Sequence, residues 1–371
     1  MRVQNFMFDV IVIGGNLAGA TAAINAASKG VKVALVERNT EPFNPAHCGE
    51  LVQDNVAESL NLDKIGCIKN LIDKMIVNIP PKEYILKFKK HKMIVFDRNH
   101  VEKELLKQAE KEGVELKLGI SMIDFKPPYE ITLDNYKTIQ GKIIIDASGI
   151  ACQVGRRIGI DTKLKPEEIG ICIQSRVQAD FDANTMKIWY HKPYAPFAYA
   201  WLFPFNKKVA NIGIGVPGGQ KLDLNKNLIE YIRDMTNGKY EIKSTFRSCV
   251  PLAPPLIKLT KENIMIAGDA ARLVYSESGG GIENALFSGR LTGIIAAKYI
   301  NGEISSLDTY QYAMRLKILR IRNGYNRRTK ASKTNEKFLK TYQGIYSLLN
   351  FINKLFPFTS YNNWLASLEK I

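Results

Sequence analysis

The sequence predicts an α/β fold with a second, antiparallel β region inserted into it. Two apolar runs, residues 10–13 and 31–36, enclose an Ala-rich stretch that follows a glycine-rich turn. A third apolar run, residues 263–268, leads into another glycine-rich turn and a helical pattern. Between them, residues 168–250 read as a succession of short strands. β-α-β segments form parallel sheets covered by helices, whereas successive short strands form antiparallel ones.

The first part of the chain has the pattern of a Rossmann-like dinucleotide-binding unit. Residues 9–37 read DVIVIGGNLAGATAAINAASKGVKVALVE, with Gly14, Gly15 and Gly19 in the turn, a helix over residues 18–28, and Glu37 at the tip of the second strand. Backbone N–H groups at the start of such a helix favour a pyrophosphate. Glu37 can accept hydrogen bonds from a ribose hydroxyl.

One position departs from the G-x-G-x-x-G pattern, because Asn16 stands where the middle glycine is expected. Asn tolerates a left-handed backbone better than most residues, so the turn can still form there. Its side chain, however, is expected to crowd the phosphate.

The second glycine-rich turn predicts the other half of a cofactor site. Gly268 and Asp269 end the apolar run, and Gly279, Gly280 and Gly281 precede a helix that reaches residue 300. The Asp carboxylate can bind a ribityl or ribose hydroxyl. The N–H groups of the turn suit a flavin pyrimidine carbonyl, which becomes negative when the flavin is reduced. An ordinary strand–loop–helix is the alternative.

These patterns divide the chain of 371 residues into three parts. We expect a discontinuous nucleotide-binding domain over residues 1–165 and 250–302, because the strand at 263–268 returns after the inserted sheet. Residues 166–249 form the antiparallel cap domain, and residues 303–371 form a helical region. Within the first domain we expect a helix over residues 96–113, and over residues 142–149 a buried strand that runs into a turn.

The formal net charge of +16 indicates an anionic partner. We favour an anionic membrane surface over nucleic acid, because the lysines are spread along the chain without a nucleic-acid-binding signature. Residues 322–371 carry nine Lys or Arg against two Asp or Glu. They also contain an aromatic cluster, which predicts a peripheral membrane segment or a helical cover on the cap domain: Phe351, Phe356, Phe358, Tyr361 and Trp364.

The five cysteines are scattered and lack C-x-x-C spacing, so neither a disulfide framework nor a metal site is predicted. No apolar run reaches the ~18 residues of a membrane span. The first residues run directly into a strand, which does not fit a signal peptide. We therefore expect a cytoplasmic protein that can sit peripherally on the inner face of the cell membrane.

The cofactor motifs together resemble the geranylgeranyl reductase family, an FAD-dependent group related to p-hydroxybenzoate hydroxylase that includes the archaeal digeranylgeranylglycerophospholipid reductases. The match covers both glycine turns, Arg98, the D-A-S-G turn at 146–149, and Cys48-Gly49 in the loop after the second strand. Ser276 stands where a Pro is usual. The resemblance implies FAD in a fold of the glutathione reductase or p-hydroxybenzoate hydroxylase type, held by Gly14, Gly15, Asn16, Ala18, Gly19, Glu37, Arg38, Cys48, Gly49, Arg98, Gly268, Asp269, Gly279, Gly280, Gly281 and Ile282.

A P-x-x-Y-x-W-x-F-P motif is similar to the one that distinguishes the reductases within this group. It is formed by Pro196, Tyr199, Trp201, Phe203 and Pro204. The three aromatic residues alternate along a strand, so we expect them on one face. They predict either an apolar wall that binds a polyprenyl chain or the core of a sandwich.

The resemblance implies a reductase that saturates C=C bonds of geranylgeranyl chains in archaeal membrane ether lipids or prenyl diphosphates. Cys48 is the candidate for proton delivery or gating, with Tyr199 as the second candidate, and packing is the alternative role for Cys48. Electrons would come from an external donor, NAD(P)H or ferredoxin.

Three other functions fit the same sequence. An aromatic-ring monooxygenase would share the fold, and an electron-transfer flavoprotein would reduce a quinone, although the Cys-rich iron–sulfur segment of such relatives is absent here. A non-enzymatic lipid-binding protein would explain a degenerate site at Asn16.

Overall fold

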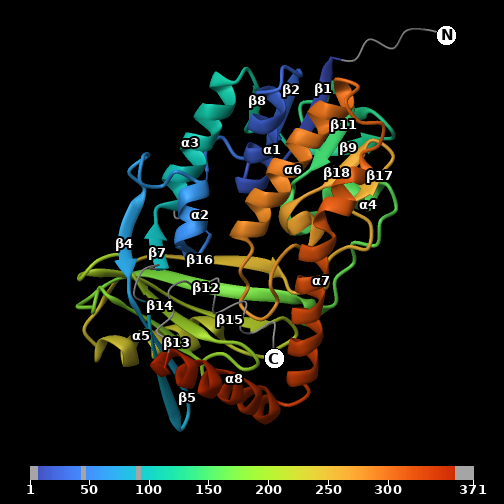
Figure 1. Cartoon of the computed structure of the whole chain (residues 1–371). Coiled ribbons are helices and arrows are strands. Elements are labelled where there is room, and N and C mark those ends of the chain that lie inside the picture. The colour runs from blue at the N-terminus through green and yellow to red at the C-terminus, as the bar shows by residue number, and fades with distance from the viewer. Residues whose placement is uncertain (1–6, 43–46, 89–92, 356–371) are drawn as a thin grey trace, which may run out of the picture. The chain divides into compact units, whose positions relative to one another are not determined.

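The structure is a computed structural model that describes residues 7–42, 47–88 and 93–355 (Figure 1). These residues form two compact units. Of the described residues, the first unit draws on 7–42, 102–165 and 250–326, and the second on 47–88, 93–101, 166–249 and 327–355. The division falls at 165/166 and 249/250, where the sequence places the ends of the cap, whereas the described residues of 47–101 and 327–355 group with the cap.

The first unit contains a largely parallel sheet in the order β17-β18-β11-β1-β2-β8. Its central strands are buried on both faces, as expected for apolar runs between helical layers, and the predicted α/β fold is confirmed. An antiparallel pair, β9 and β10, extends from β11. The strands are β1 (Phe8–Ile13), β2 (Val33–Glu37), β8 (Glu115–Leu118), β9 (Met122–Lys126), β10 (Glu130–Leu133), β11 (Thr138–Asp146), β17 (Thr260–Lys261) and β18 (Ile264–Ile266).

Helices α1 (Leu17–Ala27) and α6 (Ile282–Ile300) lie side by side (Figure 1). Glycines on α6 make this approach possible. A Cβ at Gly289 would lie 2.2 Å from the carbonyl oxygen of Ala18, and one at Gly293 would lie 2.3 Å from that of Ala22. The two helices that carry the glycine turns are thereby held together backbone to backbone.

Several shorter helical segments occur along the described part of the chain. Besides α4 (Gln153–Arg157), 3-10 turns occur at Gly149–Ala151, Pro166–Glu168 and Gly268–Ala271. Helices α3 (Arg98–Lys111) and α7 (Asp308–Ala331) contain residues of both units. The expected helix over 96–113 begins only at Arg98, because Phe96 is the last residue of a strand.

The second unit is built on a seven-stranded sheet in the order β16-β12-β15-β14-β13-β5-β6. The pairs β12–β15, β15–β14, β14–β13 and β5–β6 are antiparallel, and β13 and β5 are parallel. A three-stranded sheet, β3-β7-β4, and helix α2 (Asp54–Ser59) complete the part before α3. The strands are β3 (Leu51–Gln53), β4 (Ile68–Ile72), β5 (Lys74–Ile79), β6 (Lys82–Lys87), β7 (Met93–Phe96), β12 (Ile169–Gln178), β13 (Thr185–Trp189), β14 (Ala200–Pro204), β15 (Val209–Pro217) and β16 (Glu241–Pro251).

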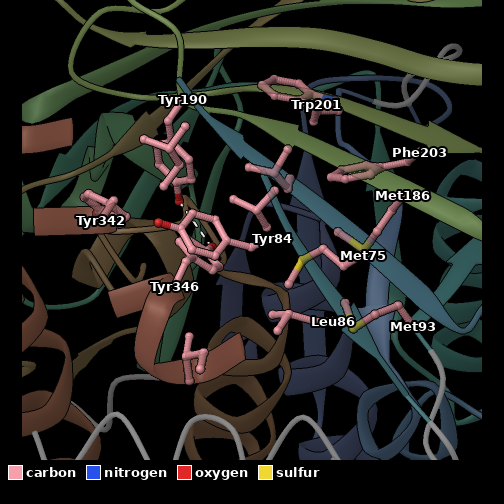
Figure 2. Packing of buried hydrophobic residues seen from close by; sticks show 14 of the residues in the cluster. Met75, Tyr84, Leu86, Met93, Met186, Tyr190, Trp201, Phe203, Tyr342 and Tyr346 are labelled. Carbon is pink, nitrogen blue, oxygen red and sulfur yellow. Dashed lines mark hydrogen bonds between the residues drawn. The ribbon is translucent and has the colours of Figure 1, made fainter. Parts of the chain in front are cut away.

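Two helices cover opposite faces of this sheet. Leu202 packs toward α5 (Leu224–Thr236) in one buried cluster. Its neighbours Trp201 and Phe203 point to the other face, where α8 (Asn335–Leu355) contributes to a second cluster (Figure 2). The helical cover expected as one role of the C-terminal region is therefore present in α8, whereas Phe356, Phe358, Tyr361 and Trp364 lie outside the described residues.

None of the helices in the described part of the chain combines the length and the apolarity that a bilayer crossing requires.

Candidate functional site

The first glycine turn has room for glycine alone at two positions, Gly14 and Gly19. Gly14 has φ +101°, and a Cβ there would lie 2.4 Å from the carbonyl oxygen of Ala147. A Cβ at Gly19 would lie 1.8 Å from the oxygen of Gly14. The turn at the start of α1 is therefore free of side chains at both positions, as a phosphate-binding backbone requires.

Asn16 behaves differently from the expectation. Its backbone is extended, with φ −74° and ψ −173°, so the left-handed conformation considered for it is wrong, and Gly14 carries the positive φ instead. The Asn16 side chain caps α1, because its Oδ1 accepts the N–H of Ala18 at 3.1 Å while its Nδ2 donates to the carbonyl of Ala147 at 2.9 Å. Asn16 thus ties the turn to the end of β11.

The Glu37 carboxylate is oriented by three donors. Oε2 accepts the N–H of Gly15 at 2.7 Å, and Oε1 accepts the backbone and side-chain N–H groups of Asn39 at 2.9 and 2.8 Å. Gly15 is needed for this approach, since a Cβ there would lie 2.9 Å from the Cβ of Glu37. A carboxylate accepts about four hydrogen bonds, so capacity remains for a ribose hydroxyl. Arg38 follows directly.

The second glycine turn brings Asp269 to the start of α6. A Cβ at Gly281 would lie 3.2 Å from Oδ1 of Asp269, and Gly281 is the residue that precedes Ile282 at the first turn of the helix. Gly279 has φ +68°. The hydroxyl of Ser276, at the position where Pro is usual, is buried and has no hydrogen-bond partner among the described residues. The bare turn, the carboxylate and this orphaned hydroxyl fit a polyhydroxylated cofactor such as FAD.

The Asp146 carboxylate of the D-A-S-G turn has a structural role. Its Oδ1 accepts hydrogen bonds from Ser148, and its Oδ2 accepts the N–H groups of Val154 and Gly155 at 2.8 and 2.9 Å. Asp146 is fully buried. It therefore caps α4.

In the second unit, Cys48, Gly49 and Glu50 form a short segment, here called the thiol loop. Gln174 on β12 donates its Nε2 to the carbonyl of Cys48 at 3.0 Å. The N–H of Glu50 points at the Cys48 Sγ at 3.2 Å. A Cβ at Gly49 would lie 3.1 Å from the Phe203 ring, so the loop passes close to the aromatic strand.

Gln174 also holds that aromatic strand. Its Oε1 accepts the indole N–H of Trp201 at 2.7 Å. The Trp201 ring lies against Gly213 of β15, where a Cβ would approach within 2.3 Å of it. The same amide side chain thus connects the Cys48 carbonyl to the Trp201 indole, and sequence reasoning did not identify it.

The three aromatic residues of the motif share one face of β14, as expected. The ring centroids of Tyr199 and Trp201 are 5.9 Å apart, and those of Trp201 and Phe203 are 6.3 Å apart. Trp201 and Phe203 are only 8% exposed and belong to a buried cluster with residues of α8 (Figure 2). Burial raises the pKa of the Tyr199 hydroxyl, which therefore stays neutral. Pro196 precedes the strand and Pro204 ends it.

A buried polar cluster next to the thiol loop was also missed. Glu50 accepts hydrogen bonds from Arg176, from Asn211 and from the backbone N–H of Arg98. Burial raises the pKa of Glu50 and lowers that of Arg176, because desolvation disfavours both charges. The only sequence signals were a Glu after Cys-Gly and an Arg inside a strand.

Two family models match the chain. The model described as geranylgeranyl reductase catalytic domain matches residues 168–248. The model described as glucose inhibited division protein A matches residues 9–154, which contain the first glycine turn.

Solved structures share the fold. A geranylgeranyl bacteriochlorophyll reductase-like protein from Thermoplasma acidophilum has a TM-score of 0.82 at 23% identity, covering 95% of this chain and 97% of that one. A flavin-dependent brominase has a TM-score of 0.67 at 17% identity, covering 90% and 92%. The fold is therefore the FAD-binding Rossmann-like fold common to such flavoproteins, and FAD is the cofactor.

Curated relatives extend the match over most of the chain. The digeranylgeranylglycerophospholipid reductase of Methanosarcina acetivorans is 30% identical over 315 residues, which are 81% of this chain and 77% of that protein. Digeranylgeranylglycerophospholipid reductase 1 of Methanococcoides burtonii is 29% identical over 318 residues, 79% and 75% of the two chains. The chain is an FAD-dependent oxidoreductase and belongs to the digeranylgeranylglycerophospholipid reductase family.

Proposed function

We propose that this protein saturates C=C bonds in the geranylgeranyl chains of archaeal membrane ether lipids or of prenyl diphosphates. The observation that carries the proposal is the coincidence of two features. The residues matched by the geranylgeranyl reductase model, 168–248, build the sheet that holds Trp201 and, through Gln174, the thiol loop. Relatives over most of the chain are named as reductases of such lipids.

The residues of the first unit hold the cofactor in this proposal. The turn at Gly14, Gly15 and Gly19, which carries no side chains, would let the pyrophosphate approach the start of α1, and Glu37 would bind a ribose hydroxyl. Asp269 would bind the ribityl side, and the glycine turn that ends at Gly281 would hold the pyrimidine. Reduced FAD, when bound, supplies the hydride that is added to one carbon of the double bond.

The second unit supplies the proton and the apolar surface. An isolated alkene forms no oxyanion, so the protein needs an acid for the second carbon rather than an oxyanion hole. Cys48 Sγ–H gives its proton to that carbon, and the thiolate is reprotonated from water. Tyr199 is the weaker candidate, since its buried hydroxyl has a raised pKa. The motif aromatics pack the isoprenoid chain, with Pro196 and Pro204 bounding their strand.

An anaerobic assay with purified protein tests this function. Pre-reduced enzyme is mixed with digeranylgeranylglyceryl phospholipid, and the product is analysed by mass spectrometry. Addition of two hydrogens per double bond is expected, and it should be abolished in Cys48→Ser while the flavin spectrum is unchanged. Incorporation of oxygen under air would instead identify a monooxygenase, and lipid binding without product would identify a binding protein.

The electron donor is external in this proposal, either NAD(P)H or a ferredoxin. Anaerobic bleaching of the bound flavin by each donor separates the two. A donor that bleaches the flavin at least as fast as the enzyme turns over belongs to the physiological class. If neither NAD(P)H nor ferredoxin bleaches the flavin, the proposed donors are wrong.

We also propose that the protein acts at the inner face of an anionic membrane, through the exposed face of α7. Tyr312, Leu316 and Leu319 lie on one side of this helix and are 66%, 69% and 53% exposed. Residues 309–326 contain four cations and no Asp or Glu, and Arg315 and Arg322 flank the apolar stripe. An apolar stripe bordered by arginines is typical of helices that lie in the headgroup region of anionic bilayers.

Sedimentation with vesicles tests the membrane proposal. Leu316→Glu combined with Leu319→Glu should abolish binding to vesicles that contain anionic lipid. Ile257→Glu is the control, because Ile257 is an exposed apolar residue that is not part of α7. Vesicle binding that is independent of lipid charge, or that survives the double substitution, would contradict this docking face. Binding to an acidic protein but not to vesicles would assign the face to a protein partner.

A further inference from the structure

Glu50 has an unusual backbone for its residue type. It adopts φ +58°, in the left-handed region, and its side chain is almost fully buried at 2% exposure. Non-glycine residues hold this conformation only where surrounding contacts enforce it. The contacts of Glu50 should therefore explain what the conformation achieves.

The Glu50 side chain joins three separate elements. Oε1 accepts the backbone N–H of Arg98, the first residue of α3, at 3.1 Å. Oε2 accepts Arg176 from β12 at 2.5 Å and Asn211 from β15 at 3.0 Å. The Asn211 amide also donates to the carbonyl of Gly49 at 3.1 Å, so it binds the loop twice.

The Glu50 backbone completes the arrangement. Its N–H points at Cys48 Sγ at 3.2 Å, and its carbonyl accepts the N–H of Phe96 at 3.0 Å. Rotation about the N–Cα bond of Glu50 would turn its side chain and the following chain relative to the Gly49–Glu50 peptide, so the left-handed φ sets where the carboxylate lies relative to the segment that carries the thiol. The direction of the thiol and the fixation of the carboxylate are thus linked through one residue.

The charges are held at a cost to stability. A buried ion pair is often no more stabilising than an apolar pair of the same volume, because both charges lose hydration. The Arg176 guanidinium stacks on Phe205, with 3.6 Å from its carbon to the ring centroid, but its Nε is buried without a partner among the described residues. We therefore attribute the Glu50–Arg176 pair to the positioning of the thiol loop rather than to the stability of the fold.

We propose that Glu50 is the positioning residue of the thiol loop, and that its carboxylate fixes the Cys48 thiol relative to the start of α3 at Arg98. The inference rests on the proposed function in so far as Cys48 is the proton donor that needs a fixed direction. Arg176 and Asn211 act through Glu50, and none of the three needs to contact the substrate.

The test uses the full chain with FAD bound and the double variant Glu50→Ala with Arg176→Met. This variant removes the anchor without leaving an unpaired buried charge. The rate of maleimide labelling of the Cys48 peptide should rise about fivefold or more, because local opening of the loop becomes easier. The kcat for alkene reduction should fall about tenfold or more through misplacement of the acid, with KM and reduction of the flavin by dithionite unchanged. Lys74→Met, which breaks the surface pair with Asp182, is the control.

A folded double variant with wild-type labelling and wild-type kcat would overturn the proposal, even if its melting temperature were lower. If the double variant does not fold, Glu50→Leu combined with Arg176→Met decides in the same way, because the leucine fills the space of the carboxylate without accepting its hydrogen bonds. If the wild-type protein does not reduce the lipid, the proposed function fails, but the labelling rates still decide whether Glu50 fixes the thiol loop.

Discussion

Replacing Gly213 with Ala tests how the Trp201 ring is held. The added Cβ would lie 2.3 and 2.5 Å from two carbons of the indole and 2.9 Å from the carbonyl oxygen of Ile173. The ring must therefore shift, which disturbs its hydrogen bond to Gln174. Overpacking of this kind costs roughly 1–3 kcal/mol, and the lost indole hydrogen bond adds about 1 kcal/mol. The expected loss of about 2–4 kcal/mol lowers the melting temperature by roughly 5–15 °C for a unit of this size.

Gly215→Ala is the matched control on the same strand. A Cβ there would lie 3.3 Å from the Cys172 sulfur and 3.6 Å from the indole, so a loss below about 1 kcal/mol is expected. Denaturant unfolding of a double-mutant cycle between Gly213→Ala and Trp201→Leu measures the coupling energy of the two positions. Removal of the indole should relieve most of the clash with the added Cβ. Equal stability of the two Ala variants, with additive effects in the cycle, would refute this account of the strand.

Three further predictions concern the cofactor turn, the thiols and the motif. Gly19→Asp should give colourless protein, because the new side chain displaces the turn and puts a carboxylate at the pyrophosphate. The control Gly344→Asp, in open space on α8, should stay yellow, and a yellow Gly19→Asp variant would contradict the assignment of this turn to FAD. Burial of its sulfur raises the pKa of the half-buried Cys172 to about 12, so its labelling at pH 8 should be at least about tenfold slower than that of the exposed Cys249 and should increase with pH; comparable rates in a peptide mass assay would refute this. Trp201→Ala should keep FAD but lose turnover of long chains, and loss of stability alone would make the ring a core residue.

The parts of the fold that follow from local pattern were predictable from the sequence. Both glycine turns, Glu37 and Asp269 lie where the β-α-β pattern puts them, because a turn of this type allows only glycine at Gly14 and Gly19. The alternation of the motif aromatics also predicted their common face correctly.

Long-range contacts were not predictable in the same way. A period-two pattern identifies a strand but not its partner, so the parallel pairing of β13 with β5 was not foreseen. Gln174 bonds to Cys48 across 126 positions of sequence, and Glu50 bonds to Asn211 across 161. Asn16 was judged by backbone tolerance, whereas its amide group makes it a helix cap.

Lipid mass spectrometry after coexpression with a pathway for unsaturated archaeal ether lipids tests the central claim most directly. The account predicts that the wild-type chain adds hydrogens pairwise to the geranylgeranyl chains, and that Cys48→Ser leaves them unsaturated although the protein remains yellow. Chains that stay unsaturated with the yellow wild-type protein, in cells shown to keep its flavin reduced, would contradict it.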